Sequence, residues 1–117
     1  MTHGEQKAET QFAVDLDCEG SSANVVSRSV ARNDSYQMFR AKISGNNACA
    51  GHSECDAIIM DNARVCAIPE LEANNLDAEL IHEAAIGKIA GEQLIKLMTL
   101  GLTEEEAEEM IISGFLK

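Results

Sequence analysis

The chain has 117 residues, of which 45% are hydrophobic and only 3% aromatic, so it forms one domain, or part of one, with a core of small aliphatic side chains. The net charge of −11 is concentrated in residues 51–117, which hold fourteen acids and four bases. Such an acidic surface repels phosphate groups, so we expect neither nucleic acid nor a membrane as a partner.

Residues 10–84 consist of short segments with the composition of strands, separated by turns rich in Gly, Asn and Asp. These turn residues tolerate left-handed backbone conformations and bond their own backbone. They recur every ~12–16 residues, which indicates stacked solenoid rungs, although a sandwich of antiparallel hairpins would give a similar pattern. The predicted strands are Thr10–Asp17, Ala23–Val30, Tyr36–Ser44, Cys55–Asp61, Val65–Glu72 and Ala78–Glu83.

The period of the pattern changes after residue 85, where apolar residues fall at three- and four-residue spacing, as on one face of an amphipathic helix. Gly101 is predicted to end this helix. The helical stripe consists of Ile86, Ile89, Ala90, Leu94, Leu97 and Met98. We therefore divide the chain into a β segment, residues 1–85, and a helical tail, residues 86–117.

A second helix is predicted from Thr103 onward. Thr103 and Glu106 have the spacing of a capping box, in which each side chain bonds a free amide of the first turn. Gly114 is predicted to end this helix. Its buried stripe is predicted to consist of Ala107, Met110, Ile111 and Phe115.

Two cysteines and a histidine lie within seven residues, at Cys49, His52 and Cys55. Thiolate and imidazole suit zinc and iron–sulfur centres, so a stand-alone metal-binding protein is one hypothesis. On a regular strand, however, Cys49 and Cys55 share one face and His52 takes the other, and a closed site normally needs a fourth ligand. The alternative is that these are packing residues.

No apolar run approaches the ~20 residues of a membrane span, and the polar N-terminus has no signal-peptide core, so we expect a cytoplasmic protein with reduced cysteines.

Four motifs follow one another in residues 51–117: GHSECDAIIMD, IPELEANN, HEAAIGKI and EEAEEMIISGF. In this order they resemble the C-terminal part of the SufB/SufD family of iron–sulfur cluster assembly proteins. The resemblance implies a right-handed parallel β-helix, here partial, followed by a short C-terminal helical segment. Family members are usually much longer, and an isolated solenoid exposes unpaired strand edges. We therefore expect the chain to continue in a longer protein or to dimerise.

The resemblance also implies a function, that of a scaffold subunit in a SUF-type assembly complex. The chain would pair with a SufB/SufD-like subunit, hold a transient iron–sulfur cluster with no cofactor of its own, and not act as an enzyme alone. By the same resemblance Cys55, His82 and Glu83 handle the cluster or its sulfur, and the tail docks a SufC-type ATPase. The docking residues would come from the set Ile86, Lys88, Leu94, Leu97, Met98, Met110, Ile111 and Phe115.

One departure from the family pattern leaves an alternative open. The SufB branch has a glutamate where this chain has Ile81. The alternative is therefore a SufD-like interaction subunit that ligates nothing. Alternation along a regular strand also places His82 and Glu83 on opposite faces, so the two converge only at a bulge or a strand end.

Overall fold

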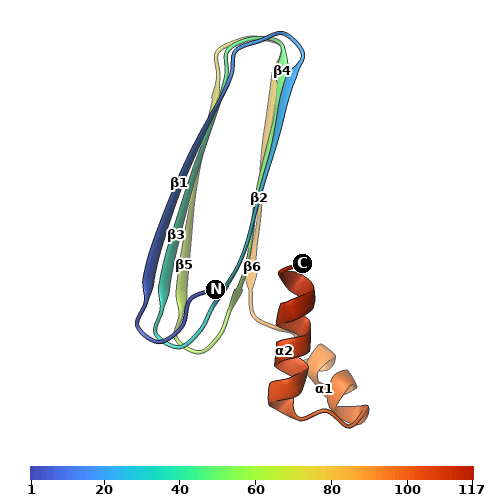
Figure 1. Cartoon of the computed structure of the whole chain (residues 1–117). Coiled ribbons are helices and arrows are strands. Elements are labelled where there is room, and N and C mark those ends of the chain that lie inside the picture. Colours follow the sequence, from blue (N-terminus) through green and yellow to red (C-terminus); the bar gives the residue numbers. More distant parts are fainter.

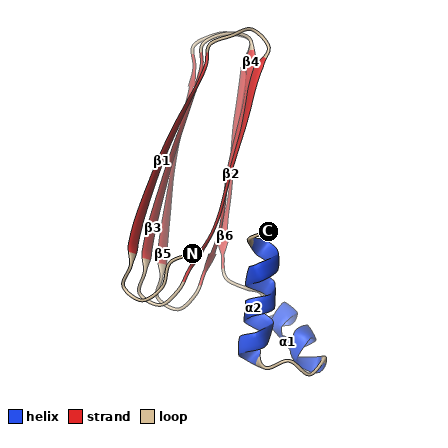
Figure 2. Cartoon of the chain, in the orientation of Figure 1, coloured by secondary structure: helices blue, strands red, loops and turns tan.

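The chain folds into six strands and two helices in a computed structural model that describes all 117 residues. The strands run the length of a narrow, flattened coil (Figure 1), and the helices gather at one end of it (Figure 2). A mainly β chain followed by helices is therefore confirmed. The elements are β1 (Lys7–Leu16), β2 (Ser21–Ala31), β3 (Tyr36–Gly45), β4 (Cys49–Ile59), β5 (Arg64–Ala73), β6 (Ala78–Gly87), α1 (Gly91–Thr99) and α2 (Glu104–Phe115).

Successive strands lie in different sheets, because the chain passes back and forth between two three-stranded sheets. One sheet has the order β1-β3-β5, the other has the order β2-β4-β6, and every pairing is parallel. Partners are 28 or 29 positions apart, as Cys55 is from Ser27 and from Ala84. Parallel pairing rules out the antiparallel sandwich and confirms a parallel β-helix, each turn of which contains two strands (Figure 1).

The corners of the coil are stacked ladders of the predicted turn residues. At one corner Gly4, Asn33 and Asp61 have φ values of +61°, +59° and +58°, which only glycine and short polar residues adopt readily. The Gly4 amide donates to Asn33 Oδ1 at 3.0 Å, and the Asn33 amide donates to Asp61 Oδ2 at 3.1 Å. Each side chain thus satisfies the backbone of the turn stacked against it, which keeps the rungs in register.

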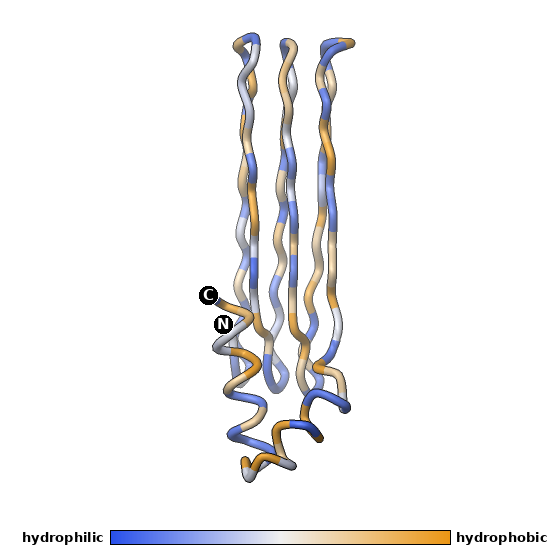
Figure 3. The backbone as a smooth tube through the Cα atoms, turned by 90° about the vertical axis from the view of Figure 1, so that its right-hand side faces the viewer, coloured by the Kyte–Doolittle hydropathy of each residue, from blue (hydrophilic) through white to orange (hydrophobic).

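The space between the two sheets is thin and filled by small side chains. Its buried centre is Leu16, Ile43 and Cys49, against which Val14, Ala23, Ala78 and Leu80 pack. At Gly51 an added Cβ would lie 2.9 Å from both Ile43 Cγ2 and Leu80 Cδ2. Figure 3 shows the three turns of the coil side by side, with hydrophobic and hydrophilic residues interspersed along each of them. Such alternation places one set of side chains inside the coil and the other outside.

Strand β4 begins at Cys49, six residues before the predicted start at Cys55. The polar run between these cysteines hides the strand from a composition-based prediction. Within it, however, Gly51 and Ser53 are small enough for the interior, while His52 and Glu54 point outward. The whole segment therefore alternates as a strand does.

The helical tail differs from its prediction at both ends. Ile86 still belongs to β6, and the first helix begins only at Gly91, because parallel pairing with β4 continues through Gly87. The predicted stop at Gly101 is confirmed by its φ of +97°. Gly114, in contrast, lies inside α2, which continues to Phe115. Neither helix is long and apolar enough to cross a membrane.

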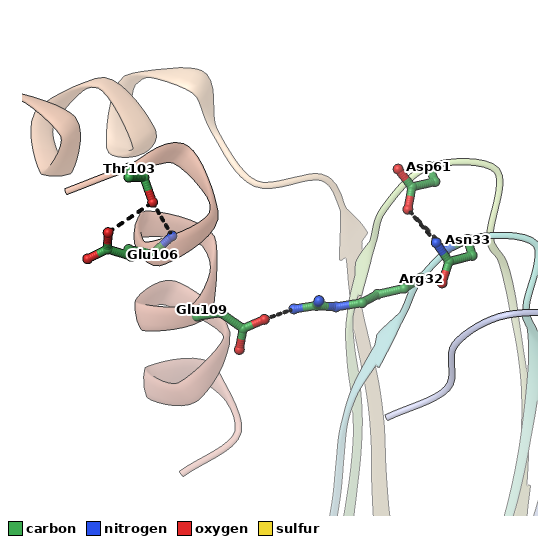
Figure 4. A network of polar contacts seen from close by, with 6 residues as sticks. All are labelled: Arg32, Asn33, Asp61, Thr103, Glu106 and Glu109. Carbon is green, nitrogen blue, oxygen red and sulfur yellow. Dashed lines mark hydrogen bonds and ion pairs between the residues drawn. The ribbon is translucent and has the colours of Figure 1, made fainter.

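Helix α2 has the predicted N-terminal cap. Thr103 Oγ1 accepts from the Glu106 amide at 3.2 Å and donates to Glu106 Oε1 at 3.1 Å, so the glutamate returns to the hydroxyl and not to the backbone (Figure 4). The buried residues of α2 are Ala107 and Ile112, whereas Met110, predicted to be buried, is 54% exposed.

Two arginines, Arg28 on β2 and Arg32 directly after it, hold α2 against the coil. Arg32 Nη2 lies 2.6 Å from Glu109 Oε1 (Figure 4), and Arg28 Nη1 donates to the Lys117 carbonyl oxygen at 2.8 Å. The tail therefore lies alongside the β2-β4-β6 sheet, near the end of the coil that contains the N-terminus (Figure 1).

Candidate functional site

Strand β4 presents its chemical groups on two opposite faces. Cys49, Ser53 and Cys55 point into the coil, and Ser53 and Cys55 are each only 1% exposed. His52 points outward. The structure therefore does not bring His52 together with the two cysteines, and no group of three or more His, Cys, Asp or Glu side chains is arranged to hold a metal ion.

Strand β6 divides the His82–Glu83 pair in the same way. His82 is in register with Ser53 and shares the interior face, where its Nδ1 is buried without a hydrogen-bond partner. Glu83 is in register with Glu54 on the outer face. Cys55 follows Ser53 by two positions on the same face of β4. Cys55 and His82 are thus diagonal neighbours on the interior of adjacent strands, and Glu83 is not part of that pair.

Glu83 belongs instead to a polar row across the outer face of the β2-β4-β6 sheet. Its Oε2 lies 3.4 Å from His52 Nε2, and Nδ1 of the same ring lies 2.9 Å from Asn24 Oδ1. Beside this row, a hydrogen bond and the negative charge of Asp56 raise the pKa of Glu54, with a smaller contribution from burial and from Glu83. The outer face therefore accommodates closely spaced carboxyl groups.

Burial in the coil dominates the chemistry of Cys55. Loss of solvent raises the pKa of its thiol above the ordinary value of 9.0, and the charge of Asp56 adds to the effect. Beside it lies a cavity of about 290 Å³ whose lining includes Thr10, Ser27, Gln37 and Phe39. A neutral thiol can act as a nucleophile or a metal ligand only after a base removes its proton.

The other two cysteines lie apart from this pair. Cys18 is exposed in the turn between β1 and β2, and Cys66 is half-buried on β5. Cys49 is in the apolar centre of the coil. All four cysteines are free thiols.

Comparison with known proteins places this arrangement in a family. Residues 1–115 match the SufBD core domain of the SUF system for FeS cluster assembly. The chain belongs to the SufBD family. Its sequence is 44% identical over 103 residues to an iron–sulfur cluster assembly SufBD family protein of Methanothermobacter thermautotrophicus, a stretch that covers 86% of this chain and 25% of that protein.

Two more relatives carry the same description. The protein of Pyrococcus horikoshii is 41% identical over 104 residues, covering 87% of this chain and 23% of the relative. The protein of Staphylococcus haemolyticus is 39% identical over 101 residues, covering 83% and 22% respectively. The chain therefore spans about a quarter of the length of the curated relatives that it matches.

The SufBD chain ends its coil on two unpaired strands. Strands β5 and β6 each have a neighbour on one side only, so the outer edge of each carries backbone groups without a strand partner. Several apolar side chains of this last turn are exposed, among them Leu71, Ile81 and Ile86. An open apolar edge of this kind is a surface on which another strand can pair.

The tail of the SufBD chain offers a second apolar surface. Leu94 and Leu97 on α1, together with Ile111 and Phe115 on α2, are half-buried, whereas Met98 and Met110 are exposed. Lys88 lies exposed in the linker before α1. Sequence analysis missed two exposed apolar residues, Ile95 at 63% and Leu100, because a periodic stripe does not show which of its sides meets the neighbouring helix.

Ser53 is the interior residue that sequence analysis also missed. Nothing in its neighbourhood of the sequence marks it, because its partner His82 is 29 positions away. A constant number of residues per turn of the coil would have predicted that Ser53 pairs with His82. The Gly, Asn and Asp residues at the corners do not recur at a constant spacing, so the sequence alone does not give that number.

Proposed function

We propose that this chain is a scaffold subunit of a SUF-type iron–sulfur cluster assembly complex. The observation that carries the proposal is the match of residues 1–115 to the SufBD core domain. In this proposal the chain catalyses nothing alone. It forms part of a surface on which iron and sulfide combine, and the cluster is cargo that leaves.

Cys55 and His82 are the donors that we assign to the assembly step. Thiolate sulfur and imidazole nitrogen both suit iron. The two residues share the interior face of β4 and β6, next to the open last turn of the coil. Because burial keeps the Cys55 thiol protonated, its engagement needs either a base or a change in its surroundings. On the interior face of the neighbouring strand β6, His82 is the ionisable side chain nearest to it in register.

The open strands β5 and β6 support pairing with a second SufB/SufD-like subunit. Backbone groups at a sheet edge bond a strand from another chain without a change of fold. Such a junction would cover Leu71 and Ile81 and would enclose the interior residues of the last turn. Cys55 and His82 would then lie close to the interface between the subunits.

The helical tail supports docking of a SufC-type ATPase. Its exposed apolar residues Ile95, Met98 and Met110 lie among acidic residues, so a basic partner with an apolar pocket would fit this surface. The tail is joined to β6 by the short linker 88–90, so that force applied to the tail reaches the strand of His82.

A pull-down against the SufC-type ATPase of the same organism tests this proposal. We compare the full chain with the Ile95→Glu variant, and we use Leu76→Glu as the matched control, because Leu76 is fully exposed in the turn between β5 and β6. We expect binding by the full chain and the control and loss of binding in Ile95→Glu. Failure of the folded full chain to bind would reject the assembly-complex proposal.

A SufD-like role is the second candidate. It is favoured by Ile81, which stands where the SufB branch has a glutamate, and by the engagement of Glu83 with His52. Reconstitution of the complete complex with iron, a sulfur donor and a reductant separates the two roles. A Cys55→Ser/His82→Ala double variant that binds the ATPase and still yields the visible absorbance of a cluster would assign the SufD-like role. Loss of that absorbance would assign cluster ligation to these two residues.

A further inference from the structure

Two buried polar atoms on neighbouring interior positions of the coil have no hydrogen-bond partner in the chain. They are Ser53 Oγ and His82 Nδ1, both buried, on residues that are in register across β4 and β6. Ser53 is only 1% exposed. A buried polar atom without a partner is costly, so such atoms are nearly always bonded to the protein or to ordered water.

The surroundings of the two atoms offer few other partners. On the far side of Ser53, the register partner in β2 is Val25, which is apolar. Along β6, the interior neighbours of His82 are Leu80 and Ala84. The Cys55 thiol is the one other side-chain group at this level of β4 that can hydrogen-bond, and sulfur is a weak donor and acceptor. Ser27 of β2 is in register with Cys55 and so lies diagonal to Ser53. His82 is therefore the one hydrogen-bonding side chain that is directly in register with Ser53.

We propose that Ser53 is a positioning residue for His82: its Oγ accepts a hydrogen bond from Nδ1–H, directly or through one water molecule, and so holds the imidazole in the Nδ1–H tautomer. The proton on one ring nitrogen determines what the other can do. With Nδ1 protonated, Nε2 carries the lone pair.

The assignment of His82 as the donor and Ser53 as the acceptor of this hydrogen bond rests on the proposed function. A histidine that binds a metal donates its other ring N–H to a neighbouring oxygen, which fixes the ring and makes the free nitrogen more basic. A hydroxyl serves this purpose because it can accept a hydrogen bond without carrying a charge into the coil. Ser53 also lies two positions from Cys55, so it fixes the ring beside the thiol that His82 would assist.

Nuclear magnetic resonance of the full chain alone tests the tautomer. The chain has three histidines, so its ring nitrogens give few signals, and a His82→Gln variant identifies those of His82. The spectra are recorded at an alkaline pH above which the ring signals no longer change, so that the neutral ring is observed. We compare the wild type with Ser53→Ala and with Ser29→Ala, an interior serine of β2 that is in register with Ala57 and not with His82.

The expected result is an Nδ1–H signature for His82 in the wild type and in Ser29→Ala. In Ser53→Ala the Nδ1 and Nε2 resonances should move toward each other as the two tautomers mix, while those of His52 remain in place. An unchanged His82 signature in Ser53→Ala, or a wild-type ring that is protonated at Nε2, would overturn the proposal.

Cluster reconstitution in the complete complex adds a functional readout. We expect Ser53→Ala to reduce the rate of cluster formation about 10-fold, the effect typical of losing the partner of a ligating histidine, and Ser29→Ala to leave it unchanged. Failure of the wild-type complex to form a cluster would reject the proposed function and leave the tautomer result standing. A normal rate in Ser53→Ala, next to an active wild type, would contradict the positioning role itself.

Discussion

His52 and Glu83 meet on the outer face of the coil, where His52 Nε2 lies 3.4 Å from Glu83 Oε2. The two residues belong to adjacent strands, and the His52 ring also contacts Asn24 on the third strand of the sheet. Glu83, which follows His82 in the sequence, therefore contacts His52 and not His82. Glu83 and His82 act on opposite sides of one sheet.

Because this pair lies on the surface, it should add little to stability. Glu83 is 62% exposed, and exposed ion pairs contribute roughly 0–1 kcal/mol. We expect Glu83→Gln to change the free energy of unfolding in urea by less than about 1 kcal/mol. His52→Ala is the matched control and should give an effect of similar size. A much larger loss in Glu83→Gln would assign the residue a structural role, whereas a small loss makes the variant a clean probe of cluster assembly.

Cys55 should resist alkylation at neutral pH. Its raised pKa keeps it as a thiol, and only the thiolate attacks iodoacetamide. We expect mass spectrometry at about pH 7 to find Cys18 alkylated and Cys55 unmodified. The alkylation rate of Cys55 should rise only when the pH exceeds the ordinary thiol pKa of 9.0. Equal rates at the two cysteines at neutral pH would contradict the burial of this thiol.

The same shift predicts how stability depends on pH. The folded chain holds the Cys55 proton to a higher pH than the unfolded chain does. The contribution of the thiol is therefore fully present below about pH 9 and is lost as the pH rises through the folded pKa. The free energy of unfolding of the wild type should thus fall more steeply above pH 9 than that of Cys55→Ala. If the free energy of unfolding fell equally steeply with pH in the two proteins, Cys55 would have the same pKa in the folded and the unfolded chain.

The regular part of the fold could be predicted because its signals are local. Asn33 and Asp61 mark corners because few residues adopt a positive φ, and Thr103 with Glu106 marks a helix start by its own hydrogen bonds. The start of β4 at Cys49 and the long β6 could not be predicted in this way. Their extent is determined by pairing with strands 28 or 29 residues away, and no local pattern records that pairing.

Gly51 should tolerate a larger residue poorly. A Cβ there would lie 2.9 Å from Ile43 Cγ2 and from Leu80 Cδ2, and the thin interior leaves these side chains no room to move. We expect Gly51→Ala to destabilise the chain by about 1–3 kcal/mol, the usual cost of overpacking. Gly87→Ala is the control, since nothing lies within 4 Å of its added Cβ. Similar unfolding midpoints for the two variants would contradict the close approach of the sheets.

The candidate site could be predicted only in part from the sequence. Alternation correctly separates Cys55 from His52 and His82 from Glu83, because the side-chain period of a strand is fixed by its geometry. The pairing of His82 with Ser53 and of Glu83 with His52 depends on the register between β4 and β6. Register is a property of the whole coil, so these partners emerge only from the structure.

Glu54 should titrate at a higher pH than an ordinary glutamate. Asp56 lies two positions along the same face of β4 and shares a hydrogen bond with it, which together with the like charge raises the Glu54 pKa above 4.5. Carbon-13 titration of the carboxyl groups should give a midpoint for Glu54 above 4.5 in the wild type. In Asp56→Asn the midpoint should fall toward 4.5. No change in Asp56→Asn would mean that the two carboxyl groups do not interact.

The contact between Arg32 and Glu109 should determine how firmly the tail is held. It joins the residue that follows β2 to α2 at 2.6 Å, but Glu109 is 63% exposed, so we expect its loss to cost about 0.2–1 kcal/mol locally. In Arg32→Ala the amides of α2 should exchange their hydrogens a few-fold faster, while those of β3 and β4 should not change. Added salt should speed exchange in the wild type and have less effect in the variant, because it screens the pair.

Arg64→Ala is the matched control for this experiment. Arg64 also loses a contact, with the Tyr36 ring 5.4 Å away, but that contact lies within the β1-β3-β5 sheet and does not involve the tail. Exchange in α2 should therefore stay at the wild-type rate. If Arg32→Ala left α2 equally protected, the buried Ala107 and Ile112, together with the Arg28 contact to Lys117, would be holding the helix. Movement of the tail relative to the strand of His82 would then not depend on the Arg32–Glu109 ion pair.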